Sequence, residues 1–430
     1  MSKGSIIKRE GKDGSTSWLL KYDAERNAQG KRQQRYKTVH GTKKVAETEL
    51  RRLLSQVDQG THVKPEKLTV KDWIGTWLES LKLRVLGKTM TQRTQEGYAD
   101  WLNLHVVPTL GSKELQKLNA SDIDTLYVKL MTSGHLGAVA KDAPQVDKGL
   151  SSGSVLHVHR AFSQCLKAAK KKRLIIHNPA EDATAPKPNK TVTNTTDEDG
   201  VQHVKALDAK QIATLLAAFT ARPMYPLVYL GLATGMRCGE MLALRWSSID
   251  LDKGTLQVAR SVERSKSGLR VKETKNKSSM RTIRVDDGLC DLLRIHRTEQ
   301  KTLALKLGTS YPQDCLVYPC VIKRPKGRQP LDGIKNAEVD FNRVWDPMTI
   351  SKEFTRVSRL AGFVGFSMHG LRHTHATQLL INGESLHVVS KRLGHSTPVI
   401  TMTTYAHVLK NADEQAANVM GDVLRGALTP

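Results

Sequence analysis

The chain has 430 residues, which is too long for one ordinary domain and predicts two or three. Hydrophobic residues make up 39% of it, enough to build cores, so a largely disordered chain is not expected. Lys and Arg number 67 against 42 Asp and Glu, which gives a formal net charge of +25. A chain this basic is typical of proteins that bind a polyanion, with nucleic acid the first candidate; a merely solubilising surface is the alternative.

The sequence gives no sign of a membrane or secreted protein. No apolar run reaches the roughly 18 residues that a membrane helix needs, and the N-terminal stretch MSKGSIIKREGKDG lacks the apolar core of a secretory signal. Five cysteines, an odd and widely spread set, fit reduced thiols in a cytoplasm. Cys315 and Cys320 could form half a zinc site, but no second pair completes it. We therefore expect a cytoplasmic protein without a membrane segment or a metal.

Residues 1–67 are predicted to form a small separate module. The alternation of apolar residues in SWLLKYD indicates a strand, and KRQQRYKTV, after a turn-like stretch at 27–30, indicates a second. Thr42 then caps a helix with a rough apolar face. Every charged residue from Arg26 to Lys44 is basic. A short β-ribbon lying in a DNA groove is therefore the favoured interpretation, and an ordinary solvated hairpin is the alternative.

Residues 68–183 are predicted to be helical. Apolar residues recur at helical spacing in DWIGTWLESL, in a second helix over about 91–106 that Pro108 ends, and in a third that opens at Ser121. A fourth helix, at about 154–172, ends in KAAKKKR. This basic run suits the helix dipole and phosphate contacts alike.

A linker and a third domain follow. Residues 184–204 are rich in Pro, Thr and Asn, show no apolar period and are predicted to be the linker, which would let two basic parts close around a duplex. Residues 205–430 are expected to form a mixed domain, so the fold class is mainly α with small β elements (α+β). Asp208 caps its first helix, and an apolar helix ends at Gly235. Arg237 follows directly, at the head of the next helix.

The middle of this third domain combines strands and helices. Strands are expected at about 255–260 and 268–272, and Lys275 lies in a turn before another strand. Helices are expected at about 288–305 and 336–360, with the basic loop KRPKGRQP between them.

The stretch from Met368 to Val408 gathers chemically active side chains at helix ends. His369 and Arg372 are three residues apart, so a helix that starts near Gly370 places them on one face. Ser385 can cap the following short helix.

A turn and a third short helix complete this stretch. The second helix ends at Gly394, and the turn there can present the ring of His395. A capping hydroxyl and Pro398 then begin the third helix, and Tyr405 lies two turns along it. Three short helices thus bring His, Arg, His and Tyr to one point. Such a cluster suits one charge-dense group, a phosphodiester.

Cleavage of a phosphodiester without a metal requires cations on the non-bridging oxygens. Arg237 and Arg372 can each offer a two-pronged guanidinium to those oxygens. His395 can donate a further hydrogen bond there.

The reaction also requires a nucleophile and proton donors and acceptors. Tyr405 is the candidate nucleophile; because a free tyrosine has a pKa of about 10, it needs a base and a positive field to attack as phenolate. His369 can exchange the tyrosine proton, and Lys275 can protonate the leaving 5′-oxygen. No carboxylate pair or Gly-rich phosphate loop is apparent, so a metal-ion mechanism and nucleotide use are both disfavoured.

Each of these residues also has an ordinary structural explanation. Arg237 could pair with Glu240, and Tyr405 could simply pack. Three basic neighbours compete with the lysine of the turn, namely Lys272, Lys277 and Arg281. A zinc site is a further alternative, formed by the four histidines of the last stretch: His369, His373, His375 and His395. The motif HExxH is absent, however, and their spacing matches no common set of zinc ligands. The hypothesis of phosphodiester cleavage therefore depends on all six candidate residues occurring together: Arg237, Lys275, His369, Arg372, His395 and Tyr405.

Five segments, in this order, resemble the tyrosine recombinases, above all the phage-type and integrative-element integrases: ATGMRCGEMLALRWSSID, TKNKSSMRTI, HGLRHTHATQLL, LGHS and TTYAHV. The resemblance covers the C-terminal domain. Residues 1–67 and 68–183 resemble the family's arm-binding and core-binding domains in order and size, with weaker motifs. The resemblance implies Tyr405 as nucleophile and an activating set of Arg237, Lys275, His369, Arg372 and His395.

The resemblance also selects one lysine of the turn. The family lysine stands six residues before the arginine that matches Arg281, which is the position of Lys275. Asn276 departs from the threonine that is commoner there.

The resemblance implies a site-specific recombinase that cuts and rejoins DNA through a 3′-phosphotyrosine intermediate, with a free 5′-hydroxyl and a Holliday junction. It implies no metal or nucleotide cofactor, and a homotetramer on paired double-stranded attachment sites in a bacterial cytoplasm. Such an enzyme integrates, and in this expectation also excises, a prophage or mobile element. The need for a directionality factor or a host DNA-bending protein stays open.

Two rival functions and one structural alternative remain. A type IB topoisomerase shares such a site, and a non-catalytic DNA-binding protein could keep the fold, but neither explains the basic N-terminal module together with all six residues. The tail ADEQAANVMGDVLRGAL could form a helix that docks on a neighbouring protomer or on its own domain.

Overall fold

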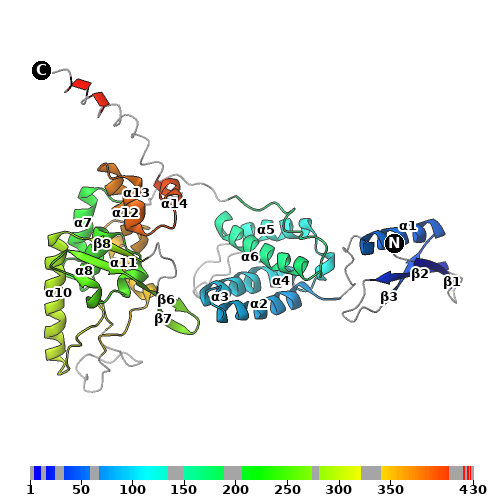
Figure 1. The fold of residues 1–430 in the computed structure, drawn as a ribbon, viewed down its shortest axis with the longest axis horizontal. Coiled ribbons are helices and arrows are strands. Elements are labelled where there is room, and N and C mark those ends of the chain that lie inside the picture. The colour runs from blue at the N-terminus through cyan, green and yellow to red at the C-terminus, as the bar shows by residue number, and fades with distance from the viewer. Residues whose placement is uncertain are drawn as a thin grey trace. The chain divides into compact units, whose positions relative to one another are not determined.

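The computed structural model of the chain describes residues 4–10, 16–24, 33–58, 67–133, 149–187, 206–273, 280–320 and 340–405, together with 420, 421, 424, 425 and 427. The chain divides into two compact units, 1–190 and 191–430, whose boundary falls inside the predicted linker. Helices predominate and the sheets are small (Figure 1), which confirms the expected fold class. Across the described ranges, every helix falls short of the length and apolar character that a bilayer crossing requires.

The N-terminal part of the first unit is a sheet covered by one helix. Its strands are antiparallel in the order β1-β2-β3, with bounds Gly4–Glu10, Thr16–Ala24 and Gln33–His40. Helix α1 (Lys43–Asp58) packs against β2. Strand β1 was not expected, because GSIIKRE holds only one adjacent apolar pair and therefore shows no alternation. The turn expected at 27–30 lies outside the described residues.

The rest of the first unit is a helical bundle around two tryptophans, Trp73 and Trp77. Its α-helices are α2 (Val70–Leu86), α3 (Gln92–Trp101), α4 (Val107–Leu110), α5 (Ala120–Ser133) and α6 (Ser152–Lys171).

The expectation that Pro108 ends the second helix is wrong. A π-helical turn at Leu102–Val106 follows α3, and the chain stays helical through Pro108 to Leu110. The N–H of Val107 bonds to the carbonyl of Leu102 in this wider turn. Pro108 then occupies the first turn of α4, where its missing N–H costs little.

The second unit holds two small antiparallel sheets. One has the order β4-β5-β8, with bounds Ile249–Asp250, Thr255–Val258 and Arg281–Arg284. The other is the hairpin of β6 (Arg260–Ser265) and β7 (Gly268–Glu273). The single strand expected at 255–260 is therefore two strands in different sheets, with Ala259 between them.

Helices make up most of the second unit. Their bounds are Ala209–Phe219 (α7), Tyr225–Thr234 (α8), Cys238–Leu242 (α9), Asp287–Lys306 (α10), Pro347–Leu360 (α11), Met368–Ile381 (α12), Leu386–Leu393 (α13) and Pro398–Tyr405 (α14). Asp208 and Ser385 cap α7 and α13 as expected. The helix expected from 336 instead begins at Pro347, because Asp346 caps it and proline favours the first helical position. Helix α12 packs against both α8 and α13, which brings their ends together.

Candidate active site

Gly235 and Arg237 turn the chain sharply between α8 and α9. Gly235 ends α8 with a φ of +64°, and a Cβ there would come within 2.7 Å of Cδ2 of His375. This position therefore favours glycine on both conformational and steric grounds. Arg237 is the N-cap residue of α9, as expected for an arginine at the head of that helix.

Glu240 holds Arg237 in place. The Nη1 of Arg237 and its backbone N–H donate to the two oxygens of the Glu240 carboxylate, at 3.0 and 2.9 Å. Arg281, on β8, donates to the same carboxylate at 2.8 Å and to the carbonyl of Arg392 at 2.7 Å. Only 3% of the Glu240 side chain is exposed, whereas 43% of the Arg237 side chain is. The ion pair considered as an alternative role for Arg237 is thus present, and it fixes a guanidinium that remains accessible.

The charge of Glu240 should matter for stability. Burial opposes ionisation of this carboxyl, but the hydrogen bond and charge of Arg281, then Arg237, hold its pKa below the ordinary 4.5. We expect Glu240→Gln to lower the free energy of unfolding by about 3–5 kcal/mol, because it removes the carboxylate charge that neutralises the buried guanidinium of Arg281. Since the native pKa is lowered, this contribution is present above pH 4.5 and is lost as the pH falls through the native value.

Urea unfolding at a series of pH values measures that effect. The difference between wild type and Glu240→Gln should shrink below pH 4.5. Glu353→Gln, which breaks an exposed pair with Arg356, is the matched control and should cost about 0–1 kcal/mol. Equal costs for the two variants would show that Glu240 contributes no more than a surface pair.

Arg372 connects the ends of two other helices. Its Nη1 donates to the carbonyl of Gly235 and its Nη2 to the carbonyl of Leu393, both at 2.8 Å. The residue is 2% exposed. Burial, and then the charge of Arg237, lower its pKa to about 9, so the guanidinium stays protonated at neutral pH.

His395 lies in the turn after Gly394, which has a φ of +68° and ends α13 as expected. Its Nδ1 is 2.6 Å from Oγ1 of the buried Thr401. With the threonine hydroxyl as donor, the neutral ring carries its proton on Nε2. Burial, and then the charges of Arg372 and Arg237, lower the pKa of His395 to about 4, so it is neutral at neutral pH.

Tyr405, at the end of α14, is buried against its own domain. It is 3% exposed and packs with Ala376, Leu380, Val389 and Leu393. Burial raises the pKa of its hydroxyl to about 12, while the nearby charge of Arg372 acts in the opposite direction. A reaction at this oxygen therefore requires a proton acceptor.

The side chain in hydrogen-bond contact with the Tyr405 hydroxyl is His373, a residue to which the sequence gave no catalytic role. Nδ1 of His373 lies 3.0 Å from the tyrosine hydroxyl. His369, which is expected to exchange that proton, is exposed and makes an edge-to-face contact with His373 at a ring-centroid distance of 4.6 Å. The sequence feature that could have pointed to His373 is the i, i+4 spacing of the two histidines, which places them on one face of α12. Partial desolvation, and then Arg372 and Arg237, lower the pKa of His369.

Lys275 lies outside the described residues, in the segment between β7 and β8. Two of the three basic residues that were alternatives to Lys275 as the catalytic cation form ion pairs within the structure. Lys272 pairs with Glu263 at 2.7 Å, and Arg281 with the buried Glu240. Lys277, the third competitor, also lies outside the described residues.

A further histidine of this region belongs to the scaffold. His375 is buried, with Nδ1 2.7 Å from the carbonyl of Leu232 and Nε2 accepting from Arg392. Burial, and then Arg392, lower its pKa to about 4. Within the described ranges, no three His, Cys, Asp or Glu side chains gather closely enough to hold a metal ion.

Comparisons with known proteins identify the family of the catalytic unit. Residues 205–412 match the phage integrase family. A XerC-like tyrosine recombinase of Caldanaerobacter subterraneus is 25% identical over 391 residues, which cover 89% of this chain and 90% of the relative. An integrase of Streptomyces ambofaciens is 24% identical, over 89% of this chain and 88% of the relative. Residues 205–412 are a domain of the phage integrase family.

The chain is thus a tyrosine recombinase, an enzyme that cuts and rejoins DNA at specific sites to integrate mobile elements. Its fold agrees with that of the Tn1549 transposon integrase in complex with a circular intermediate DNA. The TM-score is 0.59 at 16% sequence identity, over 82% of this chain and 99% of that one.

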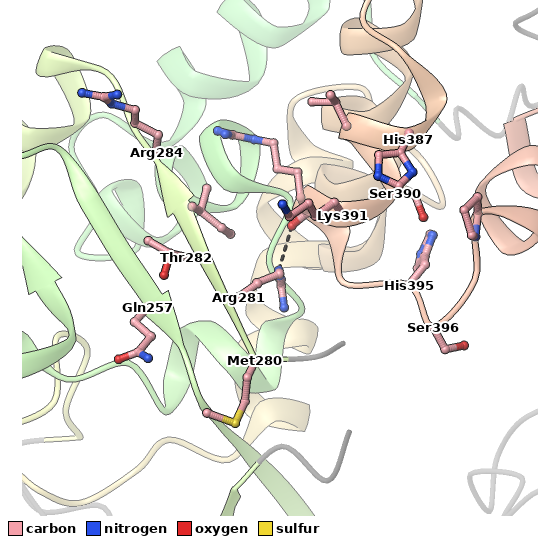
Figure 2. A pocket seen from close by; sticks show the side chains of 14 residues that line it. Gln257, Met280, Arg281, Thr282, Arg284, His387, Ser390, Lys391, His395 and Ser396 are labelled. Atoms are coloured by element: carbon pink, nitrogen blue, oxygen red, sulfur yellow. Dashed lines mark hydrogen bonds between the residues drawn. The ribbon is translucent and has the colours of Figure 1, made fainter. Parts of the chain in front are cut away.

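A basic hollow of about 1050 Å³ adjoins the active site of this recombinase. Figure 2 shows it between β8, which carries Arg281 and Arg284, and α13, which carries His387 and Lys391. His395 lies at one side of it. Arg284 and Lys391 are both exposed, so their charges are available to a polyanion.

Proposed function

We propose that this recombinase cleaves one DNA strand with Tyr405 and holds the strand as a 3′-phosphotyrosine. The observation that carries the proposal is the convergence of α8, α12, α13 and α14. It places the tyrosine hydroxyl beside a histidine and within the field of the fixed guanidinium of Arg372. Arg237 and His369 are exposed at the same site, where a phosphate from solvent can reach them.

In the proposed reaction the tyrosine oxygen attacks phosphorus, and the bond to the 5′-oxygen breaks. Negative charge develops on the non-bridging oxygens, where Arg237 and Arg372 supply fixed positive charge. Neutral His395 donates from Nε2. The leaving oxygen takes a proton from Lys275, a role that the family resemblance supports. Rejoining is the reverse reaction, with the 5′-hydroxyl as nucleophile.

The relatives support a proposal about the partners. We infer that residues 1–67 bind arm-type sites and residues 68–183 the core sites of double-stranded attachment DNA. A lambda integrase with 16% identity and a TM-score of 0.50 has been solved as a tetramer bound to a Holliday junction, which supports a homotetramer here. The relative in Bacillus subtilis is the ICEBs1 integrase, 24% identical over 75% of this chain, which supports action on a mobile element in a bacterial cytoplasm.

A nicked attachment-site duplex tests this proposal. Cleavage next to the nick releases a short 5′-hydroxyl fragment, so the covalent complex cannot religate and accumulates. Protease digestion and mass spectrometry should then locate the nucleotide adduct on Tyr405. An adduct on another residue, or none at all with DNA that the protein binds, would overturn the proposal.

The basic hollow should contribute to DNA affinity through phosphate contacts. We expect the double variant Arg284→Ala, Lys391→Ala to weaken duplex binding similarly for all sequences. The slope of log K against log salt should fall by about 2, because about one counterion is released per neutralised phosphate. Fluorescence anisotropy titrations from low to moderate salt measure this slope.

A matched double variant controls for the loss of net charge alone. Lys301→Ala, Lys306→Ala removes the same charge from α10, which lies at the margin of the catalytic unit away from α14 in Figure 1. An equal change of slope in both double variants would mean that the hollow makes no phosphate contacts.

A further inference from the structure

The hydroxyl of Tyr405 is held by a side chain that carries no role in the proposed reaction so far. Nδ1 of His373 lies 3.0 Å from the Tyr405 oxygen, and the two rings meet edge to face at a centroid distance of 5.7 Å. A tyrosine hydroxyl is the natural donor in this pair, since Nδ1 accepts when a neutral imidazole carries its proton on Nε2. In that tautomer, the contact has the direction that deprotonation of Tyr405 requires.

We propose that His373 is the proton acceptor for Tyr405, and that His369 is left to contact the DNA phosphate. The inference rests on the proposed role of Tyr405 as nucleophile and adds the group that activates it. His373 is half-buried between the tyrosine and His369, whereas His369 is exposed. Because α12 fixes both rings four residues apart, the inner one reaches the nucleophile and the outer one faces solvent.

The proton transfer is balanced without any further reactant. As the tyrosine oxygen forms its bond to phosphorus, the proton on that oxygen moves to Nδ1 of His373. The bond between phosphorus and the 5′-oxygen breaks, and that oxygen is protonated by a separate group, proposed to be Lys275. In rejoining, the imidazolium of His373 returns its proton to the tyrosine oxygen as the 5′-hydroxyl attacks.

Burial makes such an acceptor necessary. Tyr405 is 3% exposed, and the raised pKa of its hydroxyl, about 12, leaves little phenolate at neutral pH. Arg372 stabilises the phenolate by its charge but, being protonated, cannot accept the proton. Among the described residues, His373 is the one with a hydrogen bond to the tyrosine oxygen.

Two substitutions separate proton acceptance from positioning. In His373→Asn the amide oxygen can occupy the place of Nδ1 and accept the tyrosine hydrogen bond, but it cannot take the proton. In His373→Ala both functions are lost. We expect both variants to capture a nicked duplex about 10²–10⁴-fold more slowly than wild type. Capture by His373→Asn at the wild-type rate would show positioning alone and overturn the proposal.

A sulfur-substituted DNA identifies the step at which His373 acts. With a 5′-bridging sulfur at the scissile phosphate, the leaving thiolate needs no proton, so loss of the leaving-group acid is rescued and loss of the acceptor is not. Lys275→Ala is the matched control, expected to regain most of its rate on this substrate. His373→Asn should remain slow on it. Rescue of His373→Asn by sulfur would assign it to the leaving group and overturn the proposal.

Two further measurements exclude a folding defect and a failure of the underlying function. Duplex affinity and the thermal unfolding midpoint of His373→Asn should match wild type; if they do not, His373→Gln offers the same test with a longer amide. Cleavage and rejoining rates should fall by the same factor, because the proton acceptor of one direction is the donor of the other.

If Tyr405→Phe still captures DNA, the proposed function itself fails. If it does not but His373→Asn and His373→Gln are fully active, only the present inference fails.

Discussion

Replacing Tyr405 by phenylalanine should abolish covalent capture of DNA and leave duplex binding nearly unchanged. The substitution removes the attacking oxygen, and loss of a nucleophile lowers catalysis on the order of a million-fold. The ring still fills its place among Ala376, Leu380 and Leu393. The lost hydrogen bond to His373 should lower stability by only about 1 kcal/mol. Denaturing gels of a nicked attachment-site duplex measure capture, and anisotropy measures binding.

Tyr318→Phe provides a matched control for that experiment. Tyr318 is also buried in the second unit, 6% exposed, and its hydroxyl has no hydrogen-bond partner among the described residues. Its removal should therefore leave capture at the wild-type rate. Cleavage by Tyr405→Phe that equals the control would exclude Tyr405 as nucleophile and require another attacking group.

Replacing Arg237 by lysine should cost most of the activity although the charge is kept. The guanidinium is held by Glu240 through Nη1 and remains accessible, so its other N–H groups can bond to a phosphate oxygen. A lysine ammonium is a point charge, and the buried carboxylate of Glu240 competes with the phosphate for it. We expect the cleavage rate to fall about 10²–10³-fold, the usual loss when one transition-state donor is removed.

Single-turnover cleavage at saturating enzyme isolates this effect from DNA binding. Arg356→Lys is the control, because Arg356 makes an exposed pair with Glu353 within α11 and has no part in the site. Its rate should stay at the wild-type value. If Arg237→Lys turned over like Arg356→Lys, the geometry of the guanidinium would be irrelevant, and Arg237 would have a structural role only.

Local chemistry made much of the catalytic unit predictable from sequence. The caps at Asp208 and Ser385 and the left-handed glycines at 235 and 394 depend on neighbours within a few residues, so the sequence placed these helix ends correctly. Tyr405 two turns into α14 follows from the same local rules. The start of α11 has a local explanation as well, since Asp346 caps the helix and Pro347 suits its first position.

By itself, the sequence indicated most of the candidate residues and the helices that present them, because residue type, spacing and capping are properties of short segments. Only the tertiary structure decided which partners meet. Arg372 bonds to carbonyls 137 and 21 residues away, and Arg281 reaches a carboxylate 41 residues away. Spacing placed His369 and Arg372 on one face of α12, but only the packing of α14 against that helix brought His373 to the tyrosine. Such pairings depend on how buried faces fit together, and no local segment encodes that fit.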